Sequence, residues 1–149
     1  MESKNMSKNN IKTAKVVSIG MQSFDEIRSW DCFYVDKTRF IKDWWESKDK
    51  VTLVTRPRRF GKTLNMDMVK CFFSNEYAGR DDLFEGLSIW KDEKYRQLQG
   101  TYPVIFLSFA KAKGRSAASI MVMIKRIIVQ AYRKHRRIMK DDCFTDEDR

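Results

Sequence analysis

The sequence predicts an α/β fold built on a parallel sheet. Two apolar runs have the length of strands, Val51–Val54 and Pro103–Phe109, and the second is almost continuously apolar, as in strands buried on both faces. Elsewhere apolar residues recur at spacings of three and four, which predicts amphipathic helices. A strand, a loop and a helix follow one another over residues 51–73, and we interpret the rest of the chain around this unit.

A basic loop, residues 55–60, leads from the first run to the triplet Gly61-Lys62-Thr63. Glycine lets backbone amides approach an anion, lysine can reach the β and γ oxygens of a triphosphate, and a threonine hydroxyl is a hard ligand for Mg²⁺. The following helix would add free N–H groups and the positive end of its dipole. The pattern predicts a P-loop for a magnesium nucleotide, with an ordinary basic strand-to-helix loop as the alternative.

One position departs from the general P-loop pattern G-x-x-x-x-G-K-[ST], because Arg56 stands where the first glycine is expected. The segment Thr55-Arg-Pro-Arg-Arg-Phe-Gly-Lys-Thr63, preceded by Phe33-Tyr-Val-Asp-Lys-Thr38, resembles the bacterial AAA-ATPase-like family, in which this arginine is usual. The resemblance covers roughly residues 17–110. It implies an ATP-binding domain of the P-loop NTPase-like, three-layer α/β/α class, often followed by a PD-(D/E)XK nuclease-like domain.

The resemblance and the loop chemistry together assign roles within the loop. Lys62 is the candidate catalytic residue and would contact the β and γ phosphates, while Thr63 is the candidate Mg²⁺ ligand. The backbone amides around Gly61 would surround the phosphates, with arginine side chains as secondary contacts. The predicted nucleotide-binding residues are Arg58, Arg59, Phe60, Gly61, Lys62, Thr63 and Leu64, and the predicted cofactors are ATP and Mg²⁺.

An acidic residue that would complete an ATPase site is missing from the pattern. A Walker B strand is apolar and ends in a carboxylate, but the run ending at Phe109 continues into Ala110 and Lys111. We therefore expect weak or no ATP hydrolysis by this chain alone. In the wider P-loop class the two strands predicted here are not neighbours, so the sheet should be incomplete, and the simplest interpretation is the N-terminal fragment of a longer protein.

The segments before the loop predict helices. Ser23, with Glu26 three residues later, is a capping-box pattern that starts a short helix, and Asp36 or Thr38 would cap the next one. Residues 34–37 have two interpretations: a contact with the nucleotide or the loop through Tyr34, Asp36 or Lys37, or merely a helix start beside an aromatic core. We favour the second.

The segments after the loop add a connector and a long helix. Apolar residues between 83 and 90 should pack the connector onto the domain. Ser116 is a fair N-cap for a helix whose predicted buried stripe is Ile120, Met123, Ile124, Ile127, Ile128 and Ala131. Basic residues crowd the 125–140 part of this helix, so the alternative function is a nucleic-acid-binding module with a vestigial P-loop, and an ordinary solvated helix face is the simpler interpretation.

Composition sets the remaining limits. The 149 residues carry a net charge of +10 and 42% hydrophobic residues, which indicates a globular protein with polyanionic partners. Three widely spaced cysteines and a single histidine predict neither disulfides nor a zinc site, and they fit a cytoplasmic location. We expect a flexible basic lead at 1–15, a partial ATPase-like domain at 16–140, an acidic tail at 141–149 and no membrane span.

Overall fold

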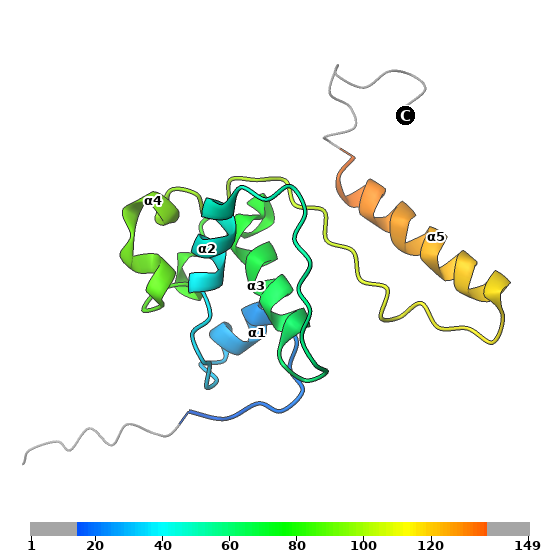
Figure 1. The fold of residues 1–149 in the computed structure, drawn as a ribbon, viewed down its shortest axis with the longest axis horizontal. Coiled ribbons are helices and arrows are strands. Elements are labelled where there is room, and N and C mark those ends of the chain that lie inside the picture. The colour runs from blue at the N-terminus through cyan, green and yellow to red at the C-terminus, as the bar shows by residue number, and fades with distance from the viewer. Residues whose placement is uncertain (1–14, 137–149) are drawn as a thin grey trace, which may run out of the picture.

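A computed structural model describes residues 15–136, which form a mostly helical protein (Figure 1). The α-helices are α1 (Phe24–Ser29), α2 (Arg39–Ser47), α3 (Lys62–Phe73), α4 (Glu93–Arg96) and α5 (Ala117–Lys134). Three short 3-10 helices, η1 (Asn75–Tyr77), η2 (Asp81–Leu83) and η3 (Ser88–Lys91), connect α3 to α4. The helices α1 to α4 gather into one body, and α5 lies apart from it at the end of a long extended segment.

The predicted α/β class is wrong. No β-strand occurs between residues 15 and 136, so this part of the chain has neither a parallel sheet nor three α/β/α layers. Most of the run 51–54 is exposed, with Val51 at 87% and Leu53 at 84%, and Ile105 in the second run is 64% exposed. An apolar run becomes a strand only when another backbone pairs with it, and periodicity along the chain does not show whether that partner is present.

The core is built on one face of α3. Met68, Cys71 and Phe72 on this helix are fully buried, and Phe72 meets Phe84 of the connector edge to face, with ring centroids 5.1 Å apart. The connector residues 83–90 therefore pack onto the domain as predicted. Among residues 15–136 the clustered buried residues are Phe24, Ile41, Met68, Cys71, Phe72, Phe73, Leu83, Phe84, Leu87, Ile89 and Tyr95.

Two helices begin at the serine N-caps that the sequence predicted. The Ser23 hydroxyl accepts a hydrogen bond from the Glu26 amide at the start of α1, as predicted. Ser116 likewise caps α5 by accepting from the amide of Ser119, and the Ser119 hydroxyl accepts from the Ser116 amide in return, which completes a capping box. A distant residue also supports α1, because the Asp67 carboxylate on α3 accepts a hydrogen bond of 2.8 Å from the Phe24 amide. The hydrogen bond between Phe24 and Asp67 holds the start of α1 against α3.

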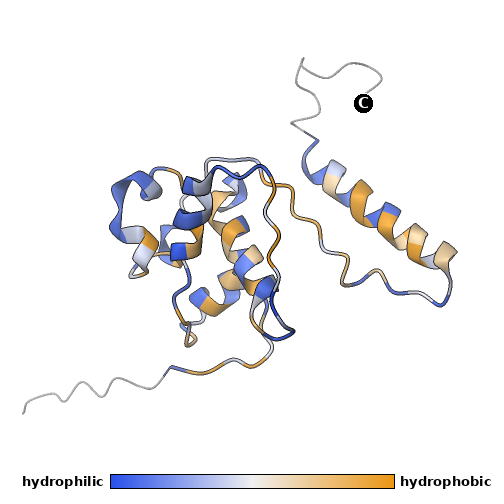
Figure 2. Ribbon diagram, in the orientation of Figure 1, coloured by the Kyte–Doolittle hydropathy of each residue, from blue (hydrophilic) through white to orange (hydrophobic). Residues whose placement is uncertain are grey.

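The predicted stripe of α5 is not buried, although five of its six residues, Ile120, Met123, Ile124, Ile127 and Ala131, are half-buried. No residue of the helix is fully buried, and Figure 2 shows apolar residues along much of its length. The Lys134 ammonium lies 2.6 Å from the Glu76 carboxylate, which links the end of α5 to η1 on the body.

The predicted basic lead and acidic tail fall almost wholly outside the described residues, as do positions 137–140 of the basic segment.

Truncating the centre of the core should cost much of the stability. We expect Phe72→Ala to lower the free energy of unfolding by about 3–5 kcal/mol, because the side chain is fully buried between Phe73 and Phe84. Urea denaturation followed by circular dichroism measures the change. Phe60→Ala is the matched control, since that ring is 58% exposed and should change stability by less than about 0.5 kcal/mol. Equal losses for the two variants would contradict this core.

Candidate functional site

The predicted loop meets a helix end. Residues 51–60 run back along α3 in Figure 1 and turn at its first residue, with Gly61 as the N-cap and Lys62 as the first helical residue. The Gly61 carbonyl accepts a hydrogen bond of 2.8 Å from the Asn65 amide, which closes the first helical turn. No side chain caps this end of the helix. The first amides of α3 and the positive end of its dipole are thus available to an anion.

The loop backbone takes an uncommon conformation at two positions. Arg59 has φ of 69° and Gly61 has φ of 72°, both in the left-handed region. Glycine adopts this region freely, whereas for arginine it costs roughly 1–2 kcal/mol. Strained backbone of this kind often occurs where a loop is shaped for a ligand. An alanine at position 61 would be strained for the same reason.

Lys62 is turned back onto its own loop. Its ammonium donates a hydrogen bond of 2.5 Å to the backbone carbonyl of Arg56. The side chain therefore crosses the loop and does not extend freely into solvent. Thr63, one residue further on, is exposed.

The segment before α2 is held by a set of side-chain hydrogen bonds to the connector. The Asp36 carboxylate accepts from the amide and hydroxyl of Thr38, at 2.9 and 2.7 Å, and from the Ser88 amide at 2.7 Å. Thr38 is fully buried, and its hydroxyl accepts from the Ile89 amide at 3.2 Å. These bonds join residues 36–38 to the start of η3, fifty residues away in sequence.

The ionisation of Asp36 reflects this network. Partial burial opposes the charged form, but the hydrogen bonds from Thr38 and Ser88 outweigh it and lower the pKa of the carboxyl below its ordinary value. The ionised carboxylate is therefore the form that the folded protein stabilises. Thr38 is the N-cap residue of α2, one of the two positions predicted, but neither its side chain nor that of Asp36 bonds the amides of the helix.

Tyr34 belongs to the core. Its ring meets Phe24 edge to face at 5.3 Å between centroids, and its hydroxyl lies 3.1 Å from the Met68 sulfur. Burial raises the pKa of Tyr34 to about 12, so the phenol stays neutral. For Tyr34 and Asp36 the favoured interpretation, a helix start beside an aromatic core, matches these contacts.

Lys37 is different from its neighbours, because its ammonium lies at the loop. A Cβ added to Gly61 would stand 3.5 Å from the Lys37 Nζ. A second lysine thus reaches the start of α3 from another part of the chain. Lys37 was one of three residues considered for a loop contact, but nothing in the sequence distinguished it from Tyr34 and Asp36.

Two polar residues of α3 were missed by sequence reasoning. Asn65 is 6% exposed, and its side-chain oxygen accepts no hydrogen bond within the described part of the chain. Asp67 is buried and bonds the Phe24 amide and the Lys70 ammonium, so it serves α1 and its own helix. The one sequence signal for Asn65 and Asp67 is their position next to the apolar residues on the buried face of the helix.

The predicted nucleotide-binding residues form one continuous segment at the loop and the first turn of α3. Arg58, Arg59 and Phe60 are exposed, while Gly61 and Lys62 are half-buried. Leu64 packs against the core, so only its backbone amide is suited to a phosphate. Among residues 15–136 no cluster of three or more His, Cys, Asp or Glu side chains has the geometry of a metal site. Any Mg²⁺ here would take ligands from Thr63 and from the phosphates themselves.

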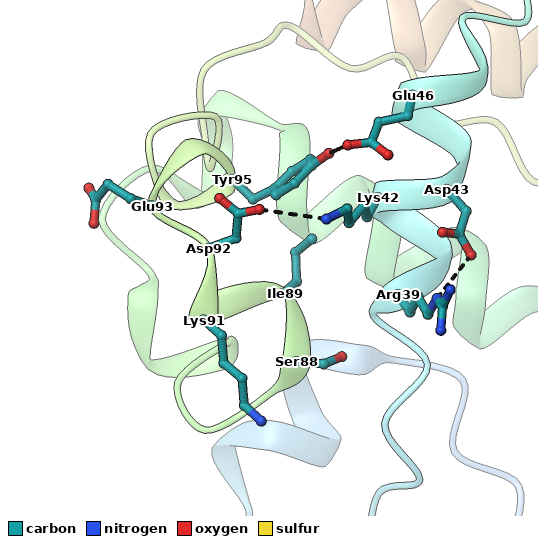
Figure 3. Close-up of a pocket in the computed structure, with 10 residues that line it drawn as sticks. All are labelled: Arg39, Lys42, Asp43, Glu46, Ser88, Ile89, Lys91, Asp92, Glu93 and Tyr95. Carbon is teal, nitrogen blue, oxygen red and sulfur yellow. Dashed lines mark hydrogen bonds and ion pairs between the residues drawn. The ribbon is translucent and has the colours of Figure 1, made fainter.

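A separate hollow of about 660 Å³ lies between α2 and the segment from η3 to α4 (Figure 3). Several of its polar side chains pair with one another: Lys42 lies 3.7 Å from Asp92, Arg39 lies 3.6 Å from Asp43, and the Tyr95 hydroxyl donates to Glu46 at 2.7 Å. Burial and the neighbouring Glu46 raise the pKa of Tyr95 to about 12. None of the predicted site residues lines this hollow, so it is not the predicted nucleotide site.

Membrane insertion has no candidate helix in the described range, since none of the helices there is both long and apolar enough to span a bilayer.

Comparison with known proteins identifies a family and one curated relative. A family model described as "Predicted AAA-ATPase" matches residues 18–148, which includes the loop and both helical parts. An uncharacterized protein in the vnfD 5' region of Azotobacter chroococcum mcd 1 is 34% identical over 115 residues, covering 76% of this chain. The match spans 21% of that protein's length, about a fifth. No solved structure matches the chain significantly.

The Asp36 network should make stability depend on pH. A carboxyl whose folded pKa is lowered stabilises the protein above its unfolded pKa near 3.8 and loses this contribution as pH falls through the folded value. We expect Asp36→Asn to lower the free energy of unfolding by about 1 kcal/mol at pH 7, because the side chain is partly exposed and water screens the loss. The difference from the native protein should shrink between pH 4 and pH 3, as measured by urea midpoints.

Asp43→Asn is the control for Asp36→Asn. Asp43 is exposed and pairs only with Arg39 at 3.6 Å, so its loss should change stability by less than about 0.5 kcal/mol. The hydrogen-bonded carboxylate would be contradicted if Asp36→Asn lost no more stability than Asp43→Asn. A loss of stability in Asp36→Asn that grew as the pH fell would contradict it as well.

Proposed function

Because the chain belongs to the AAA-ATPase-like family, we propose that it binds a nucleoside triphosphate, with ATP as the first candidate, through the loop at residues 55–63. The observation that carries this proposal is the combination at Gly61. A left-handed backbone, the uncapped start of α3 and the side chain of Lys62 occur together there. A phosphate group suits all three.

The loop residues would divide the work of binding. The amides of Gly61, Lys62 and Leu64 would donate to phosphate oxygens, since backbone donors at a helix start need no side-chain rearrangement. Lys62 would exchange the Arg56 carbonyl for the β and γ oxygens. Arg58 and Arg59 are exposed on the same loop and would add outer contacts.

The magnesium ion would be held mainly by the nucleotide. Mg²⁺ keeps several waters and commonly takes one or two protein ligands beside phosphate oxygens. The exposed Thr63 hydroxyl can supply one such ligand. When bound, the ion would neutralise phosphate charge, and the chain's own contribution is to orient it.

We limit the proposed activity to nucleotide binding. Hydrolysis needs a carboxylate that positions the metal and the attacking water, and Asp67, one helical turn beyond Thr63, is occupied by the Phe24 amide and Lys70. A nuclease-like domain beyond residue 149 stays a prediction of the family resemblance, and so does a cytoplasmic location.

Removing the lysine of the triplet should abolish tight binding. We expect Lys62→Ala to weaken Mg-ATP binding by about 10- to 100-fold, because one charge-assisted hydrogen bond to phosphate is worth roughly 1.5–3 kcal/mol. Isothermal titration calorimetry with and without magnesium measures this. Unchanged affinity in Lys62→Ala would rule out the loop as the phosphate site.

Lys111→Ala is the matched control for this experiment. It removes the same charge from an exposed position in the segment before α5, so it reports the general effect of net charge. Urea midpoints of both variants should be compared with the native protein, because Lys62→Ala also removes the bond to the Arg56 carbonyl.

A second candidate function is nucleic-acid binding by α5. Lys125, Arg126 and Arg133 are exposed and, with Gln130 and two valines, surround a shallow hollow on this helix. None of the three basic residues forms an ion pair with another described residue. A basic helix surface of this kind suits a phosphate backbone.

Salt dependence separates the two candidate functions. If α5 binds DNA, affinity should fall steeply between 50 and 200 mM salt, and the double variant Lys125→Ala/Arg126→Ala should bind more weakly with a smaller salt slope. Fluorescence anisotropy with a labelled duplex measures both quantities. Lys62→Ala should leave DNA affinity unchanged in that case, whereas a loss in Lys62→Ala would place the nucleic acid at the loop instead.

A further inference from the structure

Lys37 reaches the nucleotide loop from an element that is distant in the chain. Its ammonium stands next to Gly61, where a Cβ added to the glycine would meet it at 3.5 Å. Gly61 is also the residue whose left-handed φ of 72° turns the chain into α3. The lysine therefore lies at the helix start, where no side chain caps the backbone amides.

The backbone on both sides of Lys37 is fixed. Asp36 accepts from Thr38 and from the Ser88 amide, and Thr38 is fully buried against η3. The Lys37 carbonyl accepts a hydrogen bond of 3.0 Å from the Phe40 amide as α2 begins. The polar side chains on either side are used for attachment to the connector, and only the lysine side chain between them is directed to the loop.

The positive charges at the loop have no acidic partner. Lys37, Lys62 and the arginines at 56, 58 and 59 form no ion pair with any carboxylate among residues 15–136. Asp36, the acid next to Lys37 in the sequence, is engaged by Thr38 and Ser88. Cations brought together without a counter-ion repel one another, so this arrangement is favourable when an anion of several charges lies between them.

We propose that Lys37 is a second phosphate-contacting lysine of the loop and makes it selective for polyphosphate over monophosphate nucleotides. This inference rests on the proposed nucleotide binding and adds a residue outside the loop segment. Lys37 and Lys62 approach the start of α3 from different elements, so a chain of two or three phosphates can meet both. A single phosphate has fewer oxygens to share between two ammonium groups and the helix amides.

The test compares three nucleotides against charge-removing and charge-keeping variants. Lys37→Met removes the ammonium and keeps most of the aliphatic stem, and we expect it to weaken Mg-ATP binding about tenfold, ADP binding by less, and AMP binding hardly at all. Lys37→Arg should recover most of the ATP affinity. Lys111→Met, which makes the same charge change far from the loop, should stay within twofold of the native protein for all three ligands.

The outcomes distinguish this inference from the proposed function. If the native protein binds ATP and Lys62→Ala abolishes binding while Lys37→Met behaves like Lys111→Met, the loop site stands and the role of Lys37 is overturned. If Lys37→Met weakens all three nucleotides equally, selectivity for polyphosphate is overturned. If the native protein binds none of them, both proposals fall.

A chemical experiment on the native protein avoids any folding defect of a variant. Acetic anhydride modifies accessible lysines, and mass spectrometry reports the extent at each position. Mg-ATP should reduce acetylation of Lys37 and Lys62 several-fold and leave Lys111 unchanged. Protection of Lys62 without protection of Lys37 would overturn the inference.

Discussion

The burial of one face of α3 determines the rest of the structure. Met68, Cys71 and Phe72 are fully buried on that face, and α1, α2 and the connector all pack on it directly or through its neighbours. A helix held this firmly along one side cannot rotate about its axis without exposing the core. The direction of its N-terminus, and therefore of Gly61 and Lys62, is set by packing at the other end of the helix.

The helices could be predicted from sequence because their signals are local. Ser23 and Ser116 bind amides only three residues away, and α3 was predicted by the spacing of its own apolar residues. The predicted strands failed because a strand depends on a partner that the spacing of residues does not contain. Val51 and Leu53 have the composition of a buried strand and are more than four-fifths exposed.

The candidate site likewise has a part that local sequence signals predicted and a part that depends on contacts between distant residues. The loop and the helix start were predicted as one continuous segment, because the triplet and the following helix are neighbours in the chain. The position of the Lys37 side chain beside Gly61 could not be predicted from the sequence. It depends on hydrogen bonds that join Asp36 and Thr38 to Ser88 and Ile89, about fifty residues later. Contacts of that separation are decided by the tertiary fold, and no short motif encodes them.

The helix α5 has strong local signals for helix formation but little packing against the rest of the protein. Its capping box and eighteen residues from Ala117 to Lys134 favour a helix, while no residue of it is buried. The predicted apolar stripe described a surface suited to burial, and such a pattern does not show that a covering element is present. The Lys134 to Glu76 ion pair joins it to the body, but an exposed pair of this kind contributes little to stability.

The bond from Lys62 to the Arg56 carbonyl connects the geometry of the loop to its proposed use. An ammonium held by a neutral carbonyl keeps the loop closed across its own span, and a phosphate oxygen is a stronger acceptor because it is charged. Exchange of one acceptor for the other is favourable, since Arg56 lies in an exposed loop where water can bond the released carbonyl. The loop can thus hold its lysine near the binding position before a nucleotide arrives, which reduces the ordering that binding requires.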